Sequence, residues 1–210
     1  QALRQATAPL RIVMIEPRSV LAQGVAYATT HGEHLLNVPA ARMSAFDDRP
    51  EDFLDYVVAT TPPGGPERAS LAHAFIERRR YGEYLRVRLA EAIAASPAQL
   101  QVVHDRVAEL EPRSDGATLR LARHGELQAA GVVLAVGNTP KPLPARGAPQ
   151  LPEGRSLAAW DFDAVKAIPR DADLCIVGSG LSMVDTVLSL AENGHAGTIH
   201  VLSRHALLPL

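Results

Sequence analysis

The apolar residues of the chain fall into two patterns, which predict strands and helices in alternation. Short apolar runs predict strands over residues 10–15, 100–104, 107–110, 117–122, 131–136, 174–177 and 198–202. Apolar residues at helical spacing predict helices over 50–60, 79–95 and 181–193, and the end of a helix over 1–6. Strands that alternate with helices in this way indicate an α/β fold.

Glycine and proline clusters divide these elements into two groups. Residues 18–50 hold scattered apolar positions between glycines and prolines, and predict a long irregular excursion of the kind that usually carries function. The sequence TPPGGPE over 61–67 predicts a surface loop. Residues 138–152 are rich in proline and predict a linker, so we expect a domain boundary near 140–150.

The composition and charge argue against several classes of protein, among them nucleic-acid-binding, membrane-spanning and disulfide-rich proteins. A net charge of −2 gives no electrostatic basis for binding nucleic acid or an anionic membrane, and no apolar run approaches the ~18 residues that cross a bilayer. The one cysteine, Cys175, excludes an internal disulfide and a cysteine-rich metal site, and its place in the run 174–177 predicts a buried structural thiol. We expect a cytoplasmic protein, cut at both ends because it begins at Gln1 and stops just after a strand.

The most informative motif lies where the run 174–177 meets a helix. Gly178 would permit a tight turn, and Gly180 has no Cβ, so a pyrophosphate could approach the backbone. The free N–H groups near Leu181 and Ser182 would then face the anion, with the helix dipole behind them. Met183 replaces the third glycine of G-x-G-x-x-G, a position that governs packing more than phosphate contact. This context predicts the start of a dinucleotide-binding Rossmann unit.

The next strand ends at Ser203 and Arg204, about where such a unit selects its nucleotide. An acidic residue there suits the ribose 2′-hydroxyl of NAD, whereas an arginine suits the 2′-phosphate of NADP. The pattern therefore favours NADP, against the alternative that Arg204 is only a solvated loop residue.

A rival interpretation uses the same residues as a hydrolase elbow. The segment from Gly180 to Val184 lacks only the closing glycine of G-x-S-x-G, with Ser182 as its nucleophile. Such an enzyme also needs an acid and then a histidine further along the chain. Their order and spacing are poor here, because only Asp185 and Glu192 in the adjacent helix precede the histidines at 195, 200 and 205. The nucleotide interpretation is the better one.

Four stretches resemble a known family. They are IEP at 15–17, GVAYATTHGEHLLNVPAARMSAF at 24–46, VVLAVGNTPKPLP at 132–144 and GSGLSMVD at 178–185. Together they resemble the bacterial FAD/NAD(P)-binding proteins, two-dinucleotide flavoproteins related to flavin-dependent N-hydroxylating and Baeyer–Villiger-type monooxygenases. The stretch LLNVPAARMSAF is the most specific, and the resemblance spans nearly the whole chain.

The resemblance implies a Rossmann-like α/β fold in two domains. Residues 1–145 would form the FAD-binding domain without its first strand and glycine-rich loop, and 146–210 would begin the NADP(H)-binding domain. Glu16 would hold the adenosine ribose at the end of a strand, and Val107 would offer its backbone to the adenine. The remaining FAD contacts would come from Pro17, Gly24, Asn37, Val38, Met43, Ala135 and Gly137.

The resemblance implies an oxidoreductase that passes hydride from NADPH to flavin and acts on a small-molecule substrate. No catalytic residue and no metal site can be named from the sequence, although His31 and His34 lie near the implied flavin loop. The alternative is a nucleotide-binding module without turnover, such as a redox sensor. A single-nucleotide enzyme such as a methyltransferase would explain the glycine motif but not the IEP and LLNVPA segments.

Overall fold

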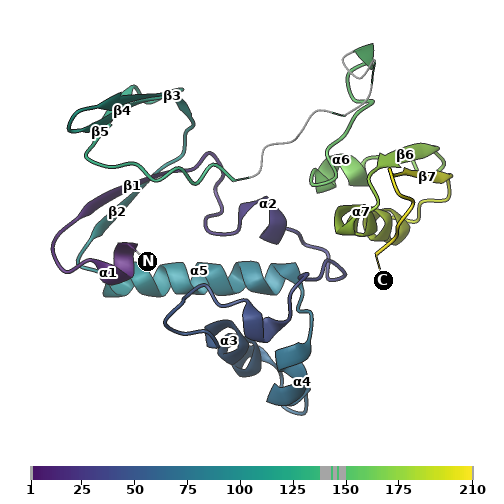
Figure 1. Cartoon of the computed structure of the whole chain (residues 1–210), viewed down its shortest axis with the longest axis horizontal. Coiled ribbons are helices and arrows are strands. Elements are labelled where there is room, and N and C mark those ends of the chain that lie inside the picture. The colour runs from purple at the N-terminus through teal and green to yellow at the C-terminus, as the bar shows by residue number, and fades with distance from the viewer. Residues whose placement is uncertain (1, 138–142, 144–145, 147–149, 210) are drawn as a thin grey trace.

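The computed structural model describes residues 2–137, 143, 146 and 150–209. Figure 1 shows a larger part of the chain built around one long helix, and a smaller part that contains the last strands and helix. The predicted linker over 138–152 and the domain boundary expected near 140–150 fall largely outside the described residues. The α/β character that the pattern predicts is present, with both parallel and antiparallel sheets.

The larger part begins with a parallel pair of strands. Helix α1 (Ala2–Gln5) leads into β1 (Arg11–Ile15), which pairs in parallel with β2 (Gln99–Val103). Helix α5 (Arg78–Ala95) runs directly before β2. Because both strands point the same way, their carboxyl ends lie at one edge of the sheet, where ligands of α/β proteins bind.

The hydrophobic core of this part lies between helices. Helix α3 (Asp52–Thr60) packs with α4 (Arg68–His73) and α5, while α2 (Gly24–Tyr27) and a short 3₁₀ helix (Ala40–Arg42) cover them from the irregular excursion. Phe53 is fully buried and meets the rings of Tyr81 and Tyr84 with centroids 4.9 and 5.1 Å apart. Burial raises the pKa of Tyr81 to about 12. The apolar residues Phe53, Leu54 and Val57 of α3 are buried, as the helical spacing predicts, whereas Val87 and Ile93 on α5 are exposed.

An antiparallel meander follows β2. It contains β3 (Val107–Arg113), β4 (Gly116–Leu121) and β5 (Glu126–Ala129), in that order across the sheet. The third strand was not predicted from the sequence, because Glu126–Ala129 carries only one apolar residue larger than alanine.

The predicted strand over 131–136 is wrong. Residues 131–137 form neither strand nor helix, and Val133 and Leu134 are 91% and 73% exposed. A strand forms only where a neighbour completes its hydrogen bonds, and the described residues offer this segment none. The run therefore leaves an exposed apolar strip.

The smaller part is a β–α–β unit. After α6 (Phe162–Lys166), β6 (Leu174–Val177) passes through the glycine corner into α7 (Leu181–Glu192), and β7 (Ile199–Leu202) then pairs with β6 in parallel. The predicted order strand, corner, helix, strand is confirmed. The prediction of a buried thiol is wrong, because Cys175 is exposed. Exposure alternates along β6, as expected of a sheet with one covered face.

Candidate functional site

The glycine corner between β6 and α7 is open. Gly178 has φ +109°, a conformation that favours glycine, and its N–H donates to the carbonyl of Leu202 over 2.8 Å. A Cβ placed on Gly178 or on Gly180 would meet no atom within 4 Å. Apart from the neighbouring residues of the chain, no described atom therefore lies within 4 Å of the position that a side chain would take at either glycine.

The start of α7 offers unpaired amide groups at that corner. The N–H groups of Gly180, Leu181 and Ser182 have no hydrogen-bond partner among the described residues, whereas the carbonyl of Gly180 accepts from Met183 over 2.9 Å. Unpaired N–H groups and the helix dipole together make the start of a helix attractive to anions. Met183, in place of the third glycine, is buried and contributes packing.

The chain after β7 returns to this corner. The Ser179 hydroxyl donates to the carbonyl of Leu207 over 2.5 Å, which ties the segment to the loop without covering the adjacent glycines. Ser203 is half-buried and Arg204 is exposed directly after β7. The hydrolase interpretation gains nothing, because Ser182 lies in the first turn of α7 and His195 lies beyond its last turn.

Glu16 follows β1 at the carboxyl edge of the β1–β2 pair. Its N–H donates to the carbonyl of Val103 over 3.0 Å, which continues the ladder. Its carboxylate accepts from the Arg18 guanidinium and from the Arg18 N–H, both over 3.1 Å, and the guanidinium contact is the main reason that the pKa of Glu16 is lowered. The carboxylate is therefore ionised at neutral pH, as an acceptor for ribose hydroxyls must be. Pro17 follows it and is exposed.

The other implied FAD residues are spread over the larger part. Gly24 begins α2 with φ +61° and open space around it, Asn37 is exposed, and Val38 is half-buried. Met43 packs against the helical core. Ala135 and Gly137 are exposed in the segment that forms no strand, and Gly137 has φ +68°. Among the described residues, no hydrogen bond or ion pair joins these residues to one another or to the glycine corner.

Val107 stands at the start of β3 and is 41% exposed. Asp105 lies two residues before Val107, is buried, and holds the turn that leads into β3. Its carboxylate accepts from the N–H groups of Arg106, Arg123 and His124 over 2.7, 2.9 and 3.0 Å, and the His124 ring lies 2.7 Å away. Burial alone would raise the pKa of Asp105, but the His124 contact and the three N–H groups outweigh it and lower the pKa. No local pattern in the sequence indicates these contacts of Asp105.

Because of the hydrogen bonds to the Asp105 carboxylate, we expect the protein to lose stability in acid. Because the folded-state pKa of Asp105 lies below the unfolded value, its contribution is present above pH ~4 and is lost as the pH falls through the folded pKa. We expect Asp105→Asn to lower the melting temperature at pH 7 by roughly 5 °C and to flatten the fall in stability between pH ~5 and ~2. Denaturant titrations across this range measure both effects. The exposed Asp115→Asn is the matched control, and an equally steep acid profile in Asp105→Asn would contradict the assignment.

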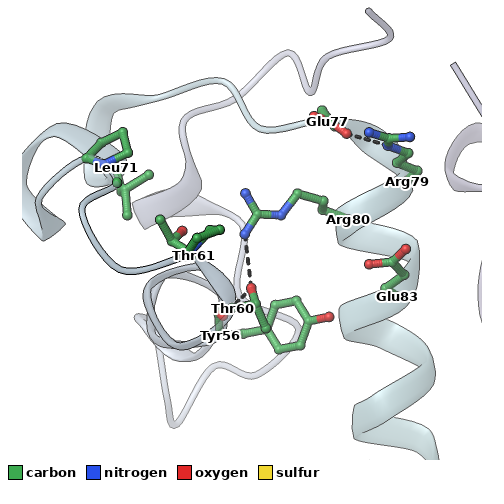
Figure 2. A pocket seen from close by; sticks show the side chains of 11 residues that line it. Tyr56, Thr60, Thr61, Leu71, Glu77, Arg79, Arg80 and Glu83 are labelled. Atoms are coloured by element: carbon green, nitrogen blue, oxygen red, sulfur yellow. Dashed lines mark hydrogen bonds and ion pairs between the residues drawn. The ribbon is translucent and has the colours of Figure 1, made fainter. Parts of the chain in front are cut away.

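Hollows in the surface lie away from the predicted site. One of them, of about 540 Å³, opens between α5 and the loop over 61–67. Figure 2 shows Arg80 reaching across it to the hydroxyl of Thr60, with Arg79 paired to Glu77 at its rim. It is lined by Tyr56, Thr60, Thr61, Pro62, Gly65, Pro66, Leu71, Glu77, Arg79, Arg80 and Glu83. None of the residues predicted to bind a cofactor is among them.

His31 and His34 have a role that the sequence did not indicate. His34 is fully buried, and its ring lies against α7, 3.0 Å from the Ser189 hydroxyl, while His31 pairs with Glu192 of the same helix. These histidines join the irregular excursion to the β–α–β unit. Their 155- and 161-residue separations from these partners explain why no local sequence signal could reveal the contact.

Comparison with known proteins supplies the broader class. A family model described as FAD-NAD(P)-binding matches residues 1–139, more than half of the 210 residues. No curated protein matches the chain. Within the described ranges, no helix is long and apolar enough to cross a membrane, and no three histidine, cysteine, aspartate or glutamate residues gather as metal ligands would.

Proposed function

The chain belongs to the FAD-NAD(P)-binding family, and from that premise we propose a Rossmann-like oxidoreductase in which residues 1–145 hold FAD and 146–210 begin an NADP(H)-binding domain. NADPH would supply hydride and FAD would accept it, for use on a small-molecule substrate in a monooxygenase-like reaction. The observation that carries the proposal is the open corner at Gly178 and Gly180, next to unpaired amide groups.

The residues of the proposed site would each contact one part of the two nucleotides. The amides of Leu181 and Ser182 would hold the NADP diphosphate, and Arg204 would bind the 2′-phosphate with Ser203 beside it. Glu16 would hold the FAD ribose, and the backbone of Val107 would meet the adenine. Contacts along the flavin would come from Pro17, Gly24, Asn37, Val38, Met43, Ala135 and Gly137.

The absorption spectrum of the purified full-length protein tests the proposal. We expect visible flavin bands, or their appearance after FAD is added, and bleaching of these bands by NADPH without oxygen. A colourless protein that takes up no FAD would contradict it. FAD and NADP binding without bleaching would instead favour the nucleotide-binding module.

The choice of nucleotide has its own test at Arg204. We expect Arg204→Ala to weaken NADPH binding by roughly tenfold or more, the effect of a hydrogen bond to a charged group, and to leave NADH binding unchanged. Titration calorimetry with both nucleotides measures the difference. The control is Arg170→Ala, since Arg170 lies beside Gly194 beyond the other end of α7. Equal losses for NADPH and NADH would contradict a 2′-phosphate contact.

A further inference from the structure

A buried ion pair joins the two parts of the chain. The Arg78 guanidinium donates from Nη1 to Oδ2 of Asp185 over 2.6 Å, and the two side chains are 9% and 10% exposed. Arg78 is the first residue of α5, and Asp185 lies in the second turn of α7, four residues after Leu181. The pair therefore links the helical core to the helix whose first turn carries the candidate diphosphate site.

Arg78 also holds the loop over 29–39, which contains the implied flavin contacts Asn37 and Val38. The side-chain Nε of Arg78 donates to the carbonyl of Leu35 over 2.8 Å, and its backbone N–H donates to the carbonyl of His34 over 2.8 Å. The planar guanidinium has donors on several edges, so one arginine can bind the loop and Asp185 at once. It also lies 5.3 Å from the centre of the Trp160 ring, at a distance typical of a cation–π contact.

His34 supplies a second bridge between the same elements. Its Nε2 lies 3.1 Å from the backbone carbonyl of Asp185, which only accepts, so Nε2 carries the proton. Its Nδ1 then accepts from the hydroxyl of Thr29 over 2.8 Å. Burial lowers the pKa of His34, in spite of the nearby Asp185 carboxylate, which agrees with a neutral ring. The loop over 29–35 is thus attached to α7 through buried, satisfied hydrogen bonds.

We propose that Arg78 is a positioning residue, which fixes α7 and its glycine corner against the loop over 29–39 through Asp185 and Leu35. The inference rests on the proposed function, in which α7 presents NADPH and this loop lies on the flavin side. Hydride transfer depends steeply on the distance between donor and acceptor, and a displacement of about 1 Å can cost on the order of 100-fold in rate. The diphosphate contacts themselves involve only the corner and need no contact from Arg78.

The test compares Arg78→Met with Arg79→Met in the full-length protein. Arg79 is the next residue of α5, but its side chain is 47% exposed, and among the described residues its ion pair is with Glu77. In Arg78→Met we expect the dissociation constant for NADP⁺ to stay within about threefold of the unsubstituted protein and flavin reduction by NADPH to slow by roughly tenfold to 100-fold. Arg79→Met should change neither. An unchanged reduction rate, or a loss of NADP⁺ affinity as large as the loss of rate, would overturn the proposal.

A second readout needs no cofactor. Trp160 is the one tryptophan of the chain and lies half-buried beside Arg78. The tryptophan fluorescence of the protein therefore reports on the surroundings of Arg78. Collisional quenching of Trp160 by acrylamide should rise in Arg78→Met and stay unchanged in Arg79→Met. If Arg78→Met does not fold, Asp185→Asn, which keeps the shape but removes the charge, should show the same increase. Unchanged quenching would overturn the inference, whereas failure of NADP⁺ to bind the unsubstituted protein would count against the proposed function only.

Discussion

Replacing Phe53 with alanine is expected to lower the free energy of unfolding by about 3–5 kcal/mol, the usual cost of removing a buried aromatic ring. Phe53 has no exposed surface and stands at the centre of the helical core, with Tyr81 at 4.9 Å and 83° and Tyr84 at 5.1 Å. The neighbouring rings are held by their own packing, so the surroundings would collapse only partly into the space. Denaturant unfolding at neutral pH measures the change.

The matched control is Phe75, which is 52% exposed and follows α4. Phe75→Ala removes the same ring from a position that is exposed to solvent, and surface substitutions usually change stability by less than about 0.5 kcal/mol. Similar losses for the two variants would mean that Phe53 does not occupy the centre of the core.

Replacing Gly180 with alanine is expected to weaken NADP(H) binding by at least about tenfold, or about 1.4 kcal/mol, with almost no change in stability. The added Cβ would meet no protein atom within 4 Å, and φ −83° with ψ −172° is a conformation that alanine adopts readily. In the proposed site, the methyl group would take space that the diphosphate needs. Titration calorimetry gives the affinity, and thermal unfolding gives the stability.

Gly180 separates binding from folding better than its neighbour does. At Gly178, with φ +109°, any side chain would strain the backbone, so a loss of binding there would have two causes. Gly131→Ala serves as the control, since a Cβ there also meets no atom within 4 Å but the residue lies in the larger part. Undiminished nucleotide affinity in Gly180→Ala would remove the corner from the binding site.

The β–α–β unit could be predicted from the sequence because local signals define it. The glycines at 178 and 180 end one strand and begin a helix, and the expected bounds differ from the observed ones by one residue at most. The helices observed over 52–60 and 78–95 were also predicted, with bounds within two residues of the expected ones, although the apolar spacing marks the buried face only in the first. Such signals depend on neighbours within a few residues.

The errors arose where burial depends on distant parts of the chain. The run at 131–136 has the composition of a buried strand but gains no strand partner, and Cys175 lies on the open face of a two-stranded sheet. The short helix α6 was missed although Asp161 caps it by accepting from the N–H of Ala164 over 3.0 Å. The junction of Arg78 with Asp185 spans 107 residues, and no periodicity in the sequence encodes such a contact.

We propose that amide groups at the start of α7 bind the diphosphate of a dinucleotide. Backbone amide resonances of isotopically labelled protein, followed by NMR during titration with NADP⁺, test this directly. The amides of Gly180, Leu181 and Ser182 are expected to show the largest and saturable shifts, because hydrogen bonds to an anion deshield their protons. Unmoved resonances at these residues while NADP⁺ saturates the protein would show that the nucleotide binds elsewhere.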